Sequence, residues 1–100
     1  MNAAFACARA YGVAIRFADL GDWGPAELRS EYDPRGPEIR LNARVAERLS
    51  SHELGEFVTI AIAHELYHHR ERIGEVTPSC DRSDRERAAD AYALEILRES

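Results

Sequence analysis

Two histidines and a glutamate stand close together in the segment His64-Glu65-Leu66-Tyr67-His68. If this segment is helical, the two histidines lie one turn apart on the same face, where two neutral imidazole nitrogens can bind one zinc ion at about 2.0–2.1 Å. Glu65 is rotated away from the first histidine by one residue, so that it can reach a zinc-bound water without binding the metal. The spacing forms the pattern HExxH and predicts a metal site with a general base beside it.

This short pattern needs support from the rest of the sequence, because a chain of this composition contains it by chance with a probability of roughly 2%. The alternative interpretation is a helix that exposes these polar residues to solvent. However, the preceding residues, Phe57 to Ala63, are apolar nearly all round the helix, which is typical of a buried helix. Histidines and a glutamate in such a helix are costly unless they have partners.

A catalytic zinc ion has three protein ligands and one open position, and the last predicted helix offers the third ligand. On that helix Glu86 and Asp90 fall on the apolar side, where carboxylates need a cation or hydrogen bonds. Two alternatives stay open: Ser83 and Glu86 have the spacing of a capping box, and Asp90 can be the buried partner of an arginine. The metal hypothesis explains both positions, with Glu86 as ligand and Asp90 accepting the second ring N–H of His64.

Length, composition and charge predict one globular domain over residues 1–100. The hydrophobic fraction of 45% argues against disorder. The formal net charge of -5 disfavours a nucleic-acid-binding surface, which is normally basic, and leaves a protein or peptide substrate open.

The N-terminal segment and the cysteines bear on the compartment. Arg9 interrupts the segment before an apolar signal-peptide region can form, and no stretch is long enough for a membrane span. We therefore expect a cytoplasmic protein without membrane association. Cys7 and Cys80 are too few for a disulfide framework, and we expect a buried small side chain and a loop thiol.

The hydrophobic periodicity predicts an α+β fold: an N-terminal helix, a small three-stranded sheet with a hairpin, a central HExxH helix and a C-terminal glutamate helix. Asn42 is expected to cap a short helix before the central one, and residues 50–52 are read as a break. The helices are expected on one face of the sheet. The predicted helices cover 2–11, 43–49, 53–72 and 83–99, and the predicted strands cover 13–17, 27–32 and 38–41.

The sequences AHELYHH (residues 63–69) and ERAADAYALEIL (residues 86–97) resemble the ImmA/IrrE-type metallopeptidase domain, also called the IrrE N-terminal-like family. They are also similar to the very short minigluzincins of the gluzincin clan. The likeness covers most of residues 28–98 and includes the predicted hairpin. Position 67 departs from it, because Tyr67 stands where the family pattern usually has glycine.

The resemblance implies a zinc-dependent metallopeptidase with one zinc ion per chain, held by His64, His68 and Glu86. It implies that Glu65 is the general base and that Asp90 supports a ligand histidine from outside the coordination sphere. It also implies that the strand formed by Ile39, Arg40, Leu41 and Asn42 is the rim of the cleft, to which an extended peptide adds as a further strand.

The chemistry expected of such a site is peptide-bond hydrolysis, in which Glu65 takes the proton of a zinc-bound water and passes it to the leaving amine. A further group that stabilises the oxyanion is expected, and the sequence leaves five candidates open: Tyr32, Tyr67, Tyr92, His52 and His69. The rival hypothesis is a zinc-bound regulatory or protein-interaction module with little or latent peptidase activity, in which zinc serves folding.

Overall fold

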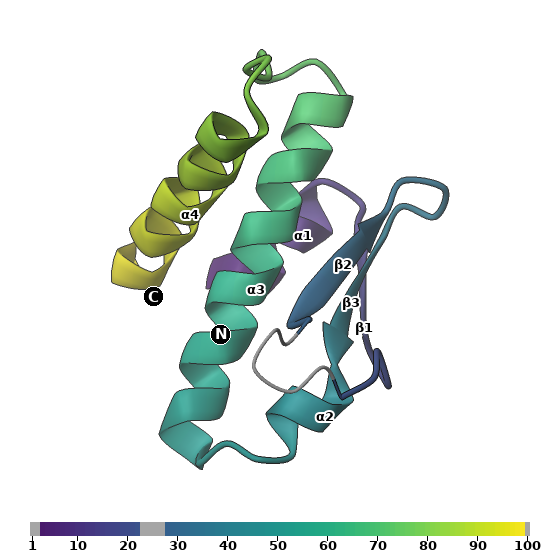
Figure 1. Cartoon of the computed structure of the whole chain (residues 1–100), viewed down its shortest axis with the longest axis vertical. Coiled ribbons are helices and arrows are strands. Elements are labelled where there is room, and N and C mark those ends of the chain that lie inside the picture. The colour runs from purple at the N-terminus through teal and green to yellow at the C-terminus, as the bar shows by residue number, and fades with distance from the viewer. Residues whose placement is uncertain (1–2, 23–27, 100) are drawn as a thin grey trace.

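The element order confirms the predicted α+β fold. The structure, a computed structural model, describes residues 3–22 and 28–99. Within them, the chain forms four helices and a small three-stranded sheet, and the two long helices lie to one side of the sheet (Figure 1). The elements are α1 (Ala3–Ala10), β1 (Ala14–Ala18), β2 (Ser30–Asp33), β3 (Glu38–Asn42), α2 (Ala43–Ala46), α3 (Ser51–Arg72) and α4 (Arg82–Glu99).

The long helix α3 begins two residues earlier than the sequence pattern predicts, because Ser50 and Glu53 form a capping box. The Ser50 hydroxyl accepts the Glu53 N–H at 3.3 Å, and the Glu53 carboxylate accepts the Ser50 N–H at 3.0 Å. These bonds satisfy two N–H groups that a helix start leaves free. Ser51 and His52 therefore belong to the first turn, and of the predicted break at 50–52 only Ser50 lies outside the helix.

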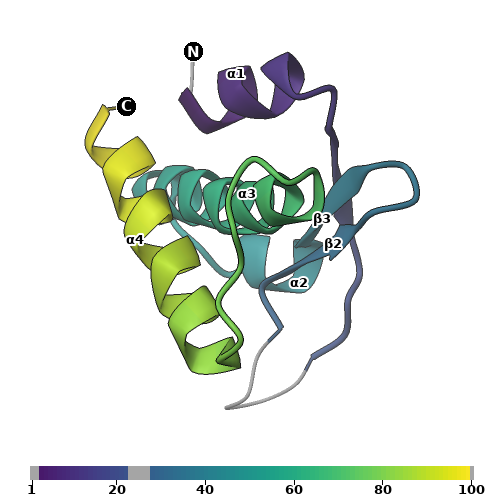
Figure 2. The same cartoon turned by 90° about the horizontal axis from the view of Figure 1, so that it is seen from above.

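Helix α3 lies between the sheet and α4, and α1 closes the remaining side of the core (Figures 1 and 2). Its side chains Ile62 and Leu66 are fully buried. Two of the buried positions on α4 are small residues: Ala89 is 0% exposed and Ala93 is 1% exposed. Small residues let two helix backbones approach closely. This contact therefore brings Glu86 and Asp90, which stand one turn before Ala89 and Ala93, towards α3.

The strand order in the sheet is β1-β3-β2, with β1 and β3 parallel and β2 and β3 antiparallel. The predicted hairpin is confirmed, since β2 and β3 pair across the turn that follows Asp33. The central place of β3 contradicts the predicted cleft rim. With a strand on each side, the backbone groups of β3 are used within the sheet, so no peptide can add to it.

The side chains of β3 have structural roles instead of the predicted substrate-binding one. Ile39 and Leu41 are 0% exposed and belong to the core, and Arg40 forms ion pairs on the other face of the sheet, the closest at 2.7 Å to Glu31. Asn42 is 1% exposed and caps α2 by accepting the Arg44 N–H at 3.1 Å. The predicted cap is therefore confirmed, and the four rim assignments are wrong.

Tyr32 on β2 ties the edge of the sheet to α3 through His69. Its hydroxyl lies 2.6 Å from Nδ1 of His69, a side chain that is 5% exposed. Burial, with the nearby charge of Arg72, lowers the pKa of His69 and favours the neutral ring, whose Nδ1 can then accept the Tyr32 proton. His69 is thus a structural histidine.

The Tyr32→Phe variant is expected to lose about 1–3 kcal/mol of unfolding free energy, because the buried Nδ1 of His69 is left without its donor. Urea unfolding followed by circular dichroism measures the loss. Tyr67→Phe is the matched control, since it removes the same atom from a hydroxyl for which the described residues give no hydrogen bond. Equal stability of the two variants would contradict the proposed role of the Tyr32 hydroxyl.

Candidate metal centre

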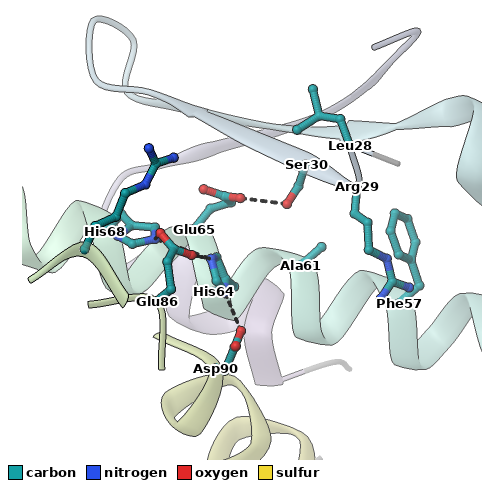
Figure 3. Close-up of a pocket in the computed structure, with 11 residues that line it drawn as sticks. Leu28, Arg29, Ser30, Phe57, Ala61, His64, Glu65, His68, Glu86 and Asp90 are labelled. Atoms are coloured by element: carbon teal, nitrogen blue, oxygen red, sulfur yellow. Dashed lines mark hydrogen bonds and ion pairs between the residues drawn. The ribbon is translucent and has the colours of Figure 1, made fainter. Parts of the chain in front are cut away.

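Three side chains from α3 and α4 converge on one point. Nε2 of His64 and Nε2 of His68 are 3.3 Å apart, as expected for residues one helical turn apart. The Glu86 carboxylate of α4 reaches both rings, with one oxygen 3.0 Å from Nε2 of His64 and the other 3.3 Å from Nε2 of His68 (Figure 3). The predicted metal ligands are therefore brought together.

These separations fit a metal ion held between the three groups. Zinc binds histidine nitrogen and carboxylate oxygen at about 2.0–2.1 Å in tetrahedral geometry, so two ligand atoms of one ion lie about 3.3–3.4 Å apart. The ligand atoms of His64, His68 and Glu86 all lie within 4.8 Å of one another, and they could hold a metal ion.

The carboxylate partners of the two Nδ1 atoms also bear on the fit. Nδ1 of His64 lies 2.9 Å from an oxygen of Asp90, and Nδ1 of His68 lies 2.8 Å from an oxygen of Glu71. An ionised carboxylate can only accept, so each neutral ring carries its proton on Nδ1 and presents a lone pair at Nε2. Two lone pairs and a carboxylate then face one another, an arrangement that a cation stabilises.

Glu71 is a functional candidate that sequence reasoning missed. Its side chain is 10% exposed, and one oxygen accepts from His68. The other oxygen is buried without a hydrogen-bond partner in the described structure. The signal in the sequence was its position three residues after His68, a spacing that also occurs in ordinary pairs on a helix surface. Both histidines thus have a carboxylate partner, Asp90 for one and Glu71 for the other.

Glu65 lies beside the three ligand residues and faces the sheet. It is 9% exposed, and one of its oxygens accepts the hydroxyl of Ser30 on β2 at 2.7 Å (Figure 3). No sequence signal pointed to Ser30. Glu65 is on a wall of an open cleft of about 450 Å³, between the chain around Ser30 and helices α3 and α4. The lining residues are Leu28, Arg29, Ser30, Phe57, Ala61, His64, Glu65, His68, Arg82, Glu86 and Asp90.

The carboxylates of α4 are more exposed than the helix wheel predicts. The Glu86 side chain is 45% exposed and that of Asp90 is 66% exposed, because both stand at the open side of the cleft. The capping-box alternative for Glu86 is wrong. Asp81 caps α4, since its carboxylate accepts the Ser83 N–H at 2.8 Å and its carbonyl accepts the Arg85 N–H at 3.1 Å. Asp90 pairs with His64, as the metal hypothesis predicts.

The five candidates for the oxyanion group occupy different places. Tyr32 lines a second hollow that also contains Glu65 and His68. Tyr67 and Tyr92 pack against each other, with ring centroids 5.8 Å apart, and line neither hollow at the metal ligands. His52 is exposed in the first turn of α3, and His69 is buried beneath Tyr32. Of the five, Tyr32 is therefore the one that shares a hollow with Glu65 and His68, although its hydroxyl contacts His69.

The Asp90→Ala variant is expected to bind zinc about 10–100-fold more weakly than the wild type, because His64 loses the acceptor that orients its ring. Competition with a fluorescent zinc chelator measures the affinity. The matched control is Glu95→Ala, which removes a carboxylate from an exposed position of the same helix. An unchanged affinity in Asp90→Ala would show that the contact with His64 does not support metal binding.

Both cysteines have free thiols, with Cys7 partly buried and Cys80 exposed. Over residues 3–22 and 28–99, no helix combines the length and the apolar character needed to cross a membrane.

Comparison of the chain with family models, curated proteins and solved structures gave no match. The predicted family therefore stays a prediction, and the geometry of the cleft is what bears on function.

Proposed function

We propose that this chain is a zinc-dependent metallopeptidase of the ImmA/IrrE type, similar to the minigluzincins, and that it hydrolyses a peptide bond in a protein or peptide substrate. The observation that carries the proposal is the convergence of His64, His68 and Glu86 at zinc-ligand spacing with Glu65 beside them. Their place in an open cleft supports a catalytic site, because a structural zinc site is normally closed by four protein ligands.

The residues of the cleft have defined tasks in this reaction. A bound zinc ion lowers the pKa of a coordinated water and polarises a carbonyl group. Glu65 accepts a proton from the attacking water and donates it to the leaving amine. The Ser30 hydroxyl occupies one oxygen of Glu65 and holds the carboxylate in place, so the other oxygen takes the proton. Asp90 and Glu71 hold the rings of His64 and His68 in the tautomer that presents Nε2 to the metal.

The substrate is proposed to add to β2, which replaces β3 as the rim of the cleft. Among residues 3–22 and 28–99, β2 pairs with β3 alone and is an edge strand, so its outer side can take an extended peptide. It is also the strand that contacts the base, since Ser30 on β2 donates to Glu65. A peptide paired with this edge lies between β2 and the metal ligands.

The proposal is tested by measuring the zinc content of protein purified without chelators, and then by digesting a proteome-derived peptide library with the zinc-loaded chain. We expect one zinc ion per chain and cleavage that is lost in Glu65→Gln. Protein without zinc would refute the proposal. Bound zinc without cleavage, combined with equal partner binding by the wild type and Glu65→Gln, would identify the zinc-bound interaction module instead.

A further inference from the structure

Two arginines of α4, Arg82 and Arg85, adjoin the catalytic cleft. They line a hollow of about 340 Å³ together with Tyr32, Glu65, His68 and Glu86. Arg82 also lines the main cleft. Both therefore stand where the part of a substrate next to the reacting bond would lie, at the His68 end of the site.

These two guanidinium groups differ from many other arginines of the chain in having no carboxylate partner among the described residues. Ion pairs with carboxylates are formed, among the described residues, by arginines that include Arg16, Arg35, Arg40, Arg44, Arg70 and Arg87. The contrast is informative in a chain of net charge -5, which has carboxylates in excess. The hollow also contains the carboxylates of Glu65 and Glu86. A metal ion bound by Glu86 would offset that charge, and the two arginines, without a carboxylate partner among the described residues, would then be available to an anion of the substrate.

Their place on the helix is also unfavourable for stability. Arg82 and Arg85 occupy the first turn of α4, where the helix dipole favours negative charge and disfavours cations. Replacing either one by glutamate would therefore suit the helix better than the native residue. Where a residue opposes the preference of the first helical turn for negative charge, a function outside the helix is expected.

We propose that Arg82 and Arg85 select substrates that carry a carboxylate within a few residues of the scissile bond, on the side that lies at His68. This inference deepens the proposed peptidase function and rests on it. A guanidinium group matches a carboxylate in shape and charge and can bind it through two parallel N–H donors. The carboxylate can come from an aspartate or glutamate side chain or from the free C-terminus of the substrate.

The first test is the residue preference of the cleaved library. We expect aspartate and glutamate on one side of the cleaved bond to be favoured over lysine by about tenfold, a typical effect of one charge-assisted contact. The double variant Arg82→Glu, Arg85→Glu should lose or reverse the preference. Arg87→Glu is the control for a charge reversal on α4, because it replaces one arginine by glutamate at a residue that lines neither hollow.

The second test separates the arginine hypothesis from the activity itself. Fluorescein-labelled octapeptides of alanine, serine and glycine carry one glutamate, glutamine or lysine, with a free or an amidated C-terminus. Zinc-loaded Glu65→Gln should bind the glutamate peptides about tenfold more tightly than the lysine peptides at low salt, and less selectively at high salt. If selectivity follows the free C-terminus instead, the bound group is the terminal carboxylate.

The outcomes are distinguishable. Cleavage without acidic preference, or a preference that survives in the double variant, overturns the role of the arginines and leaves the peptidase proposal standing. A library that stays intact refutes the peptidase proposal, while the binding series still decides whether Arg82 and Arg85 recognise a carboxylate. Equal binding of glutamate, glutamine and lysine peptides, with free or amidated ends, overturns the inference.

Discussion

Replacing Glu65 by glutamine is expected to lower kcat by about 10²–10⁴-fold, the usual contribution of a general acid–base group, with one zinc ion per chain still bound. The amide cannot take the proton of the attacking water. Its oxygen can still accept the Ser30 hydroxyl that the carboxylate accepts at 2.7 Å, so the side chain keeps its position. The loss should therefore fall on kcat with little change in KM. Steady-state kinetics on a peptide from the cleaved library, with zinc measured in the same samples, tests this expectation.

The control for this experiment is Glu56→Gln, which makes the same change at an exposed position of α3 away from the cleft. Its activity should equal that of the wild type. If Glu65→Gln keeps a tenth or more of the activity, another group is the base. If instead the variant loses zinc, Glu65 contributes to metal binding. The assignment of Glu65 as a base that does not bind the metal would then be wrong.

The fold was predictable to the level of element type and order, because each element has its own local signal. The hydrophobic pattern of α3 and the turn after Asp33 are readable from neighbouring residues alone. The order of the strands is not, because Ile39, Arg40 and Leu41 alternate between core and solvent in the same way on a central strand as on an edge strand. The resemblance placed the rim of the cleft on this strand, and the alternation could not correct it, since the rim depends on which strand has a free side.

The candidate site was predictable where helical spacing decides the geometry. The i, i+4 spacing placed His64 and His68 together, and the i, i+4 spacing of Glu86 and Asp90 placed both opposite His64. Exposure was not predictable, because a helix wheel does not show where a cleft opens the interface between two helices. Ser30 was missed because its contact with Glu65 spans 35 residues of sequence.

Removing zinc is expected to cost the folded chain about 4 kcal/mol relative to protein in zinc at a thousand times its dissociation constant. For a domain of this size the midpoint of thermal unfolding should then fall by about 15–30 °C. The physical reason is the position of the site between α3 and α4, where Glu86 from one helix meets His64 and His68 from the other. Without the ion, the metal bonds that would tie Glu86 of α4 to the two histidines of α3 are absent, and the contact between the helices weakens.

Scanning calorimetry over a series of zinc concentrations measures this linkage, and the midpoint should rise with the logarithm of free zinc. Magnesium is the matched ion control, because it prefers six oxygen ligands and should leave the midpoint unchanged. Glu86→Ala should lower the zinc dependence, since it removes the one ligand that α4 contributes. If the unfolding midpoint of the wild type does not change with zinc concentration, the two histidines and Glu86 do not bind the ion. The peptidase proposal would then fail as well.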